Sequence, residues 1–118
     1  MGLQSMLPAV ITEGVHRRGM SWELVARLMS SNPARIFGIY PRKGSLVPGS
    51  EADFTVVDPD REWVLKAEDL FYRYKQSPYV GRSFKGAVTH TIVRGRTVFA
   101  DGRIAGEPGY GRLVRRNS

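Results

Sequence analysis

The spacing of apolar residues changes near residue 40, and this change constrains the fold more than any other feature of the sequence. Before it, apolar residues recur at steps of three and four, which is typical of amphipathic helices. After it, apolar and polar residues alternate in short runs separated by glycine and proline, which is typical of strands and turns. One such change, from helical to extended spacing, predicts an α+β fold in which short helices precede an antiparallel meander.

The first helix is predicted from an apolar stripe near the N-terminus. The residues of this stripe are Leu7, Val10, Ile11 and Val15. Gly14 interrupts the stripe, and Gly19 is placed to end the helix, because glycine readily adopts a left-handed backbone. We expect this stripe to be exposed in the isolated chain.

Two more short helices are expected before the change of spacing. Ser21 is a good N-cap for the first of them. Its wide apolar face consists of Trp22, Leu24, Val25, Leu28 and Met29. Residues 30–32 (SSN) are expected to end this helix, and Asn32 to cap a third, with Pro33 in its first turn and Gly38 at its end.

The second part of the chain begins with a predicted pair of strands and their turns. Residues 45–47 and 53–58 are the expected strands, joined by a turn at Pro48-Gly49. A second turn is expected at Pro59-Asp60, with a further strand over residues 61–65.

The rest of the meander follows an irregular stretch. A short helical turn is expected over residues 67–70, and an aromatic, basic loop over residues 72–82. Residues 86–93 and 97–99 are predicted to form a hairpin around Arg94-Gly95-Arg96. The pair Asp101-Gly102 is a strong tight-turn signal before Arg103-Ile104.

These patterns predict three segments within a chain that can hold at most one modest core. Residues 1–40 form the helical segment and residues 41–105 the antiparallel segment. Residues 106–118, rich in glycine and arginine, are expected to be an irregular, mobile, basic tail.

Composition excludes several classes of site. Cysteine is absent, which excludes disulfides, thiolate nucleophiles, cysteine-zinc sites and iron–sulfur clusters. The longest apolar stretch near the start, residues 6–11, is too short to span a membrane and lacks the flanks of a signal peptide. We expect a cytoplasmic protein with no membrane contact.

The two histidines are not expected to bind metal. His16 precedes two arginines, whose charge opposes a bound cation, so it is expected to be a surface residue near a helix end. His90 alternates with Val88 and Ile92 on a strand face and is expected to be partly buried and hydrogen-bonded to a neighbour.

The acidic residues are also expected to have structural roles. They are Glu51, Asp53, Asp58, Asp60 and Glu62, and they lack the spacing of a calcium loop. No nucleophile elbow or phosphate-binding loop is present. We therefore predict no catalytic, cofactor-binding or metal-ligating residue in this chain.

A net charge of +7 leaves one binding hypothesis open. Cations and aromatic residues are interleaved over residues 71–85, as in single-strand nucleic-acid sites. They are Phe71, Tyr72, Arg73, Tyr74, Lys75, Tyr79, Arg82, Phe84 and Lys85. The same residue types can lie on an acidic neighbouring surface, and the positive charge is spread along the chain. An independent basic module for nucleic acid or another polyanion is thus the alternative function, and the less favoured one.

Three motifs in order resemble the C-terminal part of the cyclic-amide amidohydrolases, the family of dihydroorotases, allantoinases and hydantoinases. The motifs are residues 32–39 (NPARIFGI), 43–58 (KGSLVPGSEADFTVVD) and 93–98 (VRGRTV). Residues 77–82 (SPYVGR) and 91–95 (TIVRG) are most similar to the allantoinase branch. Glu51 stands where the family usually has Asp, a difference expected to perturb a turn rather than chemistry.

The resemblance implies a fold and a function for the parent protein. Members have a metal-dependent (β/α)₈ barrel followed by strands of a small β-sandwich, and this chain resembles the end of the barrel plus those strands. The family's ligands for zinc or another divalent metal lie upstream of the matched part.

The parent would hydrolyse a cyclic amide or ureide with a metal-bound hydroxide. This chain alone would be structural and inactive, with no cofactor of its own. Its expected partners are the upstream barrel and, in a homo-oligomer, other copies of the chain.

Overall fold

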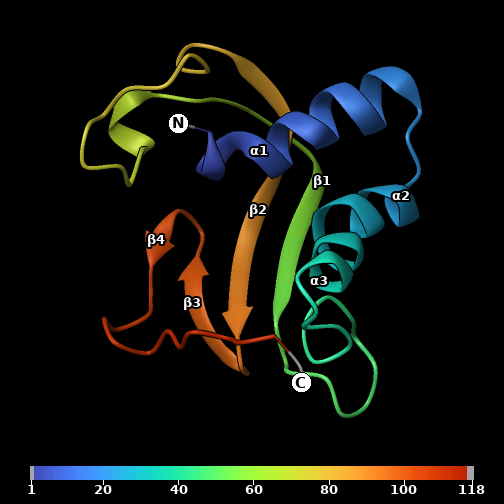
Figure 1. Ribbon diagram of the computed structural model, residues 1–118. Coiled ribbons are helices and arrows are strands. Elements are labelled where there is room, and N and C mark those ends of the chain that lie inside the picture. Colours follow the sequence, from blue (N-terminus) through green and yellow to red (C-terminus); the bar gives the residue numbers. More distant parts are fainter. Residues whose placement is uncertain (1, 117–118) are drawn as a thin grey trace. The chain divides into compact units, whose positions relative to one another are not determined.

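A computed structural model describes residues 2–116, and its contacts divide the chain into two units. Unit 1 comprises Met1–Ser21 and Val57–Val88, and unit 2 comprises Trp22–Val56 and Thr89–Ser118. Each unit combines helical residues with strand residues that are distant in sequence (Figure 1). The predicted α+β class, with helices before an antiparallel sheet, is confirmed. The division at residues 40 and 105 stays a prediction.

The helix of unit 1 runs as predicted but changes its geometry along its length. α1 (Leu3–Ala9) contains Pro8 and continues directly into a π-helical segment, η1 (Val10–Arg17). Pro8 has no N–H to donate to the carbonyl four residues earlier, so it interrupts the regular hydrogen bonding of α1. Gly19, with φ of 68°, follows the helix and confirms the expected end.

The apolar stripe of this helix is not exposed as expected. Ile11 is fully buried, and the other members of the stripe are half-buried. The expectation was wrong because β2 (Ser83–Val93), distant in sequence, covers Ile11 within unit 1.

Unit 2 contains one continuous helix where two were predicted. α2 (Trp22–Ala26) is followed by the π-helical η2 (Arg27–Ser31) and then by α3 (Asn32–Ile36). The predicted stop at residues 30–32 and the Asn32 cap are wrong, since Asn32 itself has helical φ and ψ of −67° and −48°. The wide π turn before Pro33 accommodates that proline without ending the helix. Gly38 ends the helix as predicted, with φ of 69°.

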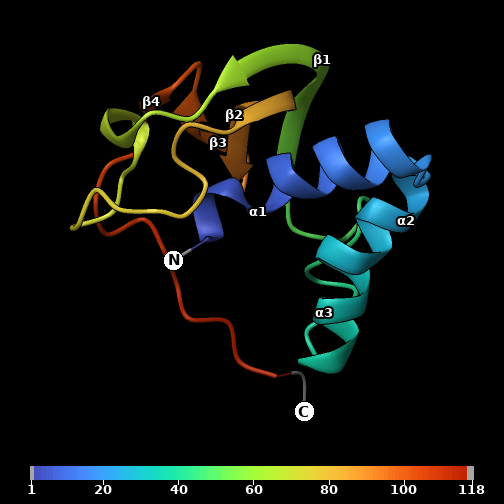
Figure 2. The ribbon, with the colours of Figure 1, turned by 90° about the horizontal axis from the view of Figure 1, so that it is seen from above.

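The sheet contains four strands in the order β1-β2-β3-β4. They are β1 (Phe54–Val64), β2 (Ser83–Val93), β3 (Arg96–Ala100) and β4 (Arg103–Ile104) (Figure 2). β2 pairs with β3, and β3 with β4, both antiparallel. The predicted meander is therefore confirmed in the last third of the chain.

Left-handed residues form both tight turns of the meander. Arg94 and Gly95 have φ of 46° and 78°, and Asp101 and Gly102 have φ of 46° and 84°. Two positive φ angles in succession match the right-handed twist of the strands that such a turn joins.

β1 joins two of the predicted strands, and the segment before it also differs from the prediction. Residues 45–47 form no strand, although the turn at Pro48-Gly49 is present, with Ser50 donating to the Val47 carbonyl at 3.0 Å. The second expected turn is wrong, because Pro59 lies inside β1. An edge strand tolerates proline. The Asp58 carboxylate accepts the Asp60 N–H at 3.1 Å. This hydrogen bond is typical of turns, although the chain does not reverse its direction here.

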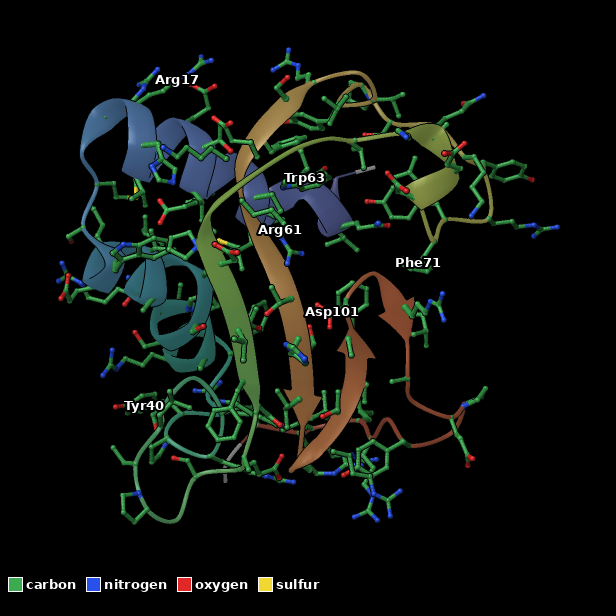
Figure 3. All side chains as sticks on the ribbon, turned by 180° about the vertical axis from the view of Figure 1, so that it is seen from behind. Arg17, Tyr40, Arg61, Trp63, Phe71 and Asp101 are labelled. Carbon is green, nitrogen blue, oxygen red and sulfur yellow. The ribbon has the colours of Figure 1, made fainter. Side chains whose placement is uncertain are left out.

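The main apolar cluster lies in unit 1. Leu65, Leu70 and Phe84 are buried together, and the Trp63 ring stacks on Phe84 at a centroid distance of 4.9 Å (Figure 3). Leu70 directly follows η3 (Ala67–Asp69), the short helical turn that was predicted. This cluster therefore ties the irregular stretch after β1 to the start of β2.

Gly86 is the position on β2 that brings the first helix close. Its φ is 113°, and a Cβ placed there would lie 2.5 Å from the Ile11 Cγ2 atom. Its carbonyl also accepts the Trp63 indole N–H at 3.0 Å. Only a residue without a side chain satisfies both the backbone conformation and the helix contact.

We predict that Gly86→Ala lowers the free energy of unfolding by about 3 kcal/mol, through left-handed strain and overpacking. Gly81→Ala is the matched control in the same unit, since Gly81 also has positive φ but open space around it. The control should cost about 1–2 kcal/mol from strain alone. Urea denaturation measures the free energy of unfolding of both variants. Equal losses in the two variants would contradict a contribution from the contact with Ile11.

Candidate functional site

Both histidines bind groups of their own unit. The His16 Nε2 lies 2.6 Å from the Pro59 carbonyl, so Nε2 carries the proton and donates. His90 is half-buried, with Nδ1 3.0 Å from the Thr89 hydroxyl, which confirms the expected hydrogen-bonded core histidine.

The donor set of the described chain does not fit a divalent metal. Within residues 2–116, no three His, Asp or Glu side chains gather in a way that could hold an ion. The reaction chemistry of a metal centre is therefore not assigned to these residues.

The aromatic residues of the basic loop mostly face inward. Phe84 is buried, and Tyr72 and Tyr79 pack against its cluster. Phe71 and Tyr74 are 52% and 62% exposed. Because three of the five rings belong to the core, the loop does not present the row of stacking surfaces that single-strand binding uses.

Polar side chains of the first helix bind the main chain of the β part of unit 1. We call Gln4, Thr12 and His16 the helix clamp. Each contacts a different segment: Gln4 the end of η3 and the residues after it, Thr12 β2, and His16 β1. Gln4 and Thr12 were not singled out from the sequence. Their spacing by multiples of four in an apolar helix was the available signal.

Gln4 uses its whole side-chain amide. Nε2 donates to the Asp69 carbonyl at 2.7 Å, and Oε1 accepts the Phe71 N–H at 3.0 Å. The Gln4 backbone N–H donates to the Tyr72 hydroxyl at 2.9 Å. Three hydrogen bonds thus join the start of α1 to residues 69–72.

Thr12 makes the equivalent contact on β2. Its Oγ1 accepts the Lys85 N–H at 3.1 Å and donates to the Pro8 carbonyl at 2.8 Å. A buried hydroxyl with both functions satisfied holds the helix to the strand next to Gly86.

Unit 2 contains a second polar group, which we call the ion-pair cluster: Arg42, Lys43, Glu51 and Asp53. The Glu51 carboxylate lies 2.6 Å from the Arg42 Nε and 2.5 Å from the Lys43 Nζ. Lys43 also pairs with Asp53. The sequence predicted turn caps and solvated carboxylates here. It did not predict that Glu51 and Asp53 both pair with Lys43.

The ion pairs lower the pKa of Glu51 and raise the pKa of Lys43. Hydrogen bonds from Lys43 and then Arg42 lower the pKa of Glu51 from 4.5 to about 2. Burial lowers the pKa of Lys43, but hydrogen bonds to Asp53 and Glu51 outweigh it, so the pKa of Lys43 is raised. Both groups are thus charged at neutral pH. The Glu51 side chain serves this cluster rather than a turn.

Arg94 connects the ion-pair cluster to the tail. Its backbone N–H donates to Asp53 Oδ1 at 2.9 Å, and its carbonyl accepts the Tyr110 hydroxyl at 3.1 Å. The guanidinium donates to the Tyr110 carbonyl, and Arg94 and Arg96 both lie over the Tyr110 ring, at 4.2 and 4.8 Å. Residues 106–116 contain no helix or strand, and the contacts of Tyr110 hold this segment to the β2–β3 turn. The mobility expected of the tail stays a prediction.

Several large apolar side chains of the described residues are exposed. In unit 2, large apolar side chains such as Ile36 and Leu46 are 79% and 72% exposed. No helix within residues 2–116 has the length and apolar character needed to cross a bilayer.

The Glu51 ion pairs predict a pH dependence of stability. Since its folded pKa is depressed, the stabilisation is complete above about pH 4.5 and is lost as pH falls toward 2. The melting temperature of Glu51→Gln should lie below wild type at pH 7, and the difference should vanish near pH 2. Glu107→Gln is the control, because it removes the same charge from an exposed position in unit 2. A difference that is constant from pH 7 to pH 2 would contradict this.

The fold of this chain is similar to part of several solved structures. An L-hydantoinase (dihydropyrimidinase) from Arthrobacter aurescens superposes with a TM-score of 0.94 at 38% identity, over 98% of this chain and 26% of that protein. A D-hydantoinase (dihydropyrimidinase) from Thermus sp. superposes with a TM-score of 0.88 at 30% identity, over 93% of this chain and 24% of that protein.

Sequence comparison leads to the same group of proteins. An allantoinase of Rubrobacter xylanophilus is 54% identical over 97% of this chain and 25% of its own length. An allantoinase of Salmonella paratyphi B is 46% identical over 83% of this chain and 21% of its own length. The chain spans about a quarter of the length of these relatives.

The resemblance drawn from the three motifs is therefore confirmed, including its allantoinase-like character. The profile of the Amidohydrolase family matches residues 3–98, more than half of the chain. This chain belongs to the amidohydrolase family.

Proposed function

We propose that the chain is the C-terminal portion of a metal-dependent hydrolase of cyclic amides or ureides, of the allantoinase type. The observation that carries this proposal is the 54% identity to the Rubrobacter xylanophilus allantoinase over 97% of the chain. A cytoplasmic location, and a divalent metal held by residues upstream of this segment, are parts of the proposal. That metal would supply the Lewis acid and the hydroxide for ring opening.

The chain's own role in this enzyme is structural. Its polar side chains are used within its two units, in the helix clamp and the ion-pair cluster. Large apolar side chains that are exposed in unit 2, such as Ile36 and Leu46, are available to the remaining three-quarters of the parent. The alternative, a basic module for nucleic acid, is not supported, because its aromatic residues are mostly core residues.

The test is a chimera in which this chain replaces the matching quarter of the Rubrobacter xylanophilus allantoinase. We expect allantoin hydrolysis with kcat/KM within about tenfold of that allantoinase, since a folded segment preserves the positions of upstream groups. The 118-residue chain alone, supplied with Zn²⁺, should show no turnover.

Two outcomes would contradict the proposal. A chimera that is folded by circular dichroism and carries its metal, yet does not hydrolyse allantoin, argues against the proposed function. Turnover of allantoin, dihydroorotate or hydantoin by the isolated chain argues against the structural role.

Self-association of the isolated chain is a second proposal, carried by its exposed apolar residues. Those of the segment from residue 46 to the start of β1 are Leu46, Val47, Phe54 and Val56. A second copy can cover this surface when the rest of the parent is absent. The buried Ile11 is not part of it.

We expect a dimer or larger species in sedimentation at micromolar concentration. The double variant Leu46→Asp, Val56→Asp should be monomeric, because a charge opposes burial of the apolar surface. Leu113→Asp, which changes an even more exposed leucine in the tail, should leave the association unchanged. A strictly monomeric wild-type chain would refute the proposal.

A further inference from the structure

We propose that Gln4 is a positioning residue of this enzyme: its amide fixes the first turn of α1 on the main chain of residues 69–72, and thereby the chain that enters α1. This inference rests on the proposed function, in which the catalytic groups precede this segment in the parent. Gln4 touches no substrate or metal in this assignment; it acts through the backbone.

The geometry of the Gln4 contact is that of a neighbouring strand. Its amide donates to the Asp69 carbonyl and accepts the Phe71 N–H, at 2.7 and 3.0 Å. These two main-chain groups lie two residues apart, like the acceptor and donor that the N–H and C=O of one residue on a neighbouring parallel strand would satisfy. A side-chain amide can take the place of these two main-chain groups, because it offers both a donor and an acceptor.

The helix side of the contact needs an external partner. Gln4 is the second residue of α1, where the backbone N–H has no acceptor within the helix. The Tyr72 hydroxyl accepts this N–H at 2.9 Å. α1 has no side-chain cap at Gly2, so the contacts with residues 69–72 take over the function of a cap.

The loop side of the contact is firmly anchored. Leu70 lies between the two main-chain groups that Gln4 binds and is 1% exposed, packed with Leu65 and Phe84. Tyr72 packs against the same cluster. The first turn of α1 is therefore held by residues that pack in the core of unit 1, and not by a free loop.

Only glutamine satisfies this arrangement. A glutamate would keep the acceptor for Phe71 but place a second oxygen against the Asp69 carbonyl, and an asparagine is one methylene too short. Methionine matches the length of the side chain and makes neither bond. Release of the first turn would shift the chain before it, and misplacement of catalytic groups by about 1 Å can cost about 100-fold in rate.

The experiment uses the active chimera and measures kcat and KM separately for Gln4→Met, Gln4→Glu and Tyr72→Phe. We expect kcat to fall at least tenfold for both Gln4 variants, with KM changed less than threefold, since substrate contacts lie elsewhere. Tyr72→Phe, which loses one of the three hydrogen bonds, should give a smaller loss in kcat.

Two controls separate positioning from stability. Gln76→Met changes an exposed glutamine of the same loop and should leave kcat unchanged. Thr12→Val removes the hydrogen bond between the same helix and β2, away from the first turn of α1. If its melting temperature falls as much as that of Gln4→Met, it should still retain the wild-type kcat. A wild-type kcat in Gln4→Met, or an equal loss in Thr12→Val, would overturn the inference.

A second measurement distinguishes failure of the inference from failure of the proposed function. Hydrogen exchange on the 118-residue chain should show faster exchange at the amides of residue 4 and Phe71 in Gln4→Met, with Lys85 unchanged. Unchanged protection of these two amides from exchange would overturn the proposed Gln4 contact itself. An inactive wild-type chimera would count against the proposed function alone, while the exchange experiment would still decide the contact.

Discussion

The contact of the first helix with β2 is the interaction on which unit 1 depends. At Gly86 the helix approaches so closely that Ile11 occupies the space of a side chain, and the neighbouring Lys85 backbone is bound by Thr12. The carbonyl of Gly86 is used in turn by Trp63, which stacks on Phe84 of the core. Helix, strand and apolar cluster therefore meet at one residue without a Cβ, which explains how so short a chain buries an aromatic core.

Unit 2 is held together by charge and hydrogen bonds where unit 1 uses apolar packing. Asp53 binds both Lys43 and the backbone of Arg94, so the segment before β1 is attached to the β2–β3 turn. Arg94 then extends the connection to Tyr110 through its main chain and its guanidinium. The depressed pKa of Glu51 means that its ion pairs contribute to stability, fully so above about pH 4.5 and therefore at neutral pH.

These internal connections agree with the structural role that we propose for this segment. His16 binds a main-chain carbonyl, His90 binds a hydroxyl, and Glu51 and Asp53 pair with neighbouring cations. In the proposed role, such a segment gives a larger protein rigid points of attachment. The Gln4 contact at the first turn of α1 would be one of these points.

Local structure was determined by the sequence itself: the helix ends at Gly19 and Gly38, the turns at Arg94-Gly95 and Asp101-Gly102, and the α+β class. These depend on the conformational limits of single residues, which act over a few positions. The three ordered motifs also identified the family. Only the tertiary structure decided that Asn32 stays helical, that Pro59 stays in a strand, and that Gln4 and Thr12 bind main chain 65–73 residues away. Local preferences of about 1 kcal/mol are overridden by packing. The spacing of Gln4 and Thr12 in the sequence does not show which distant main-chain groups their side chains bind.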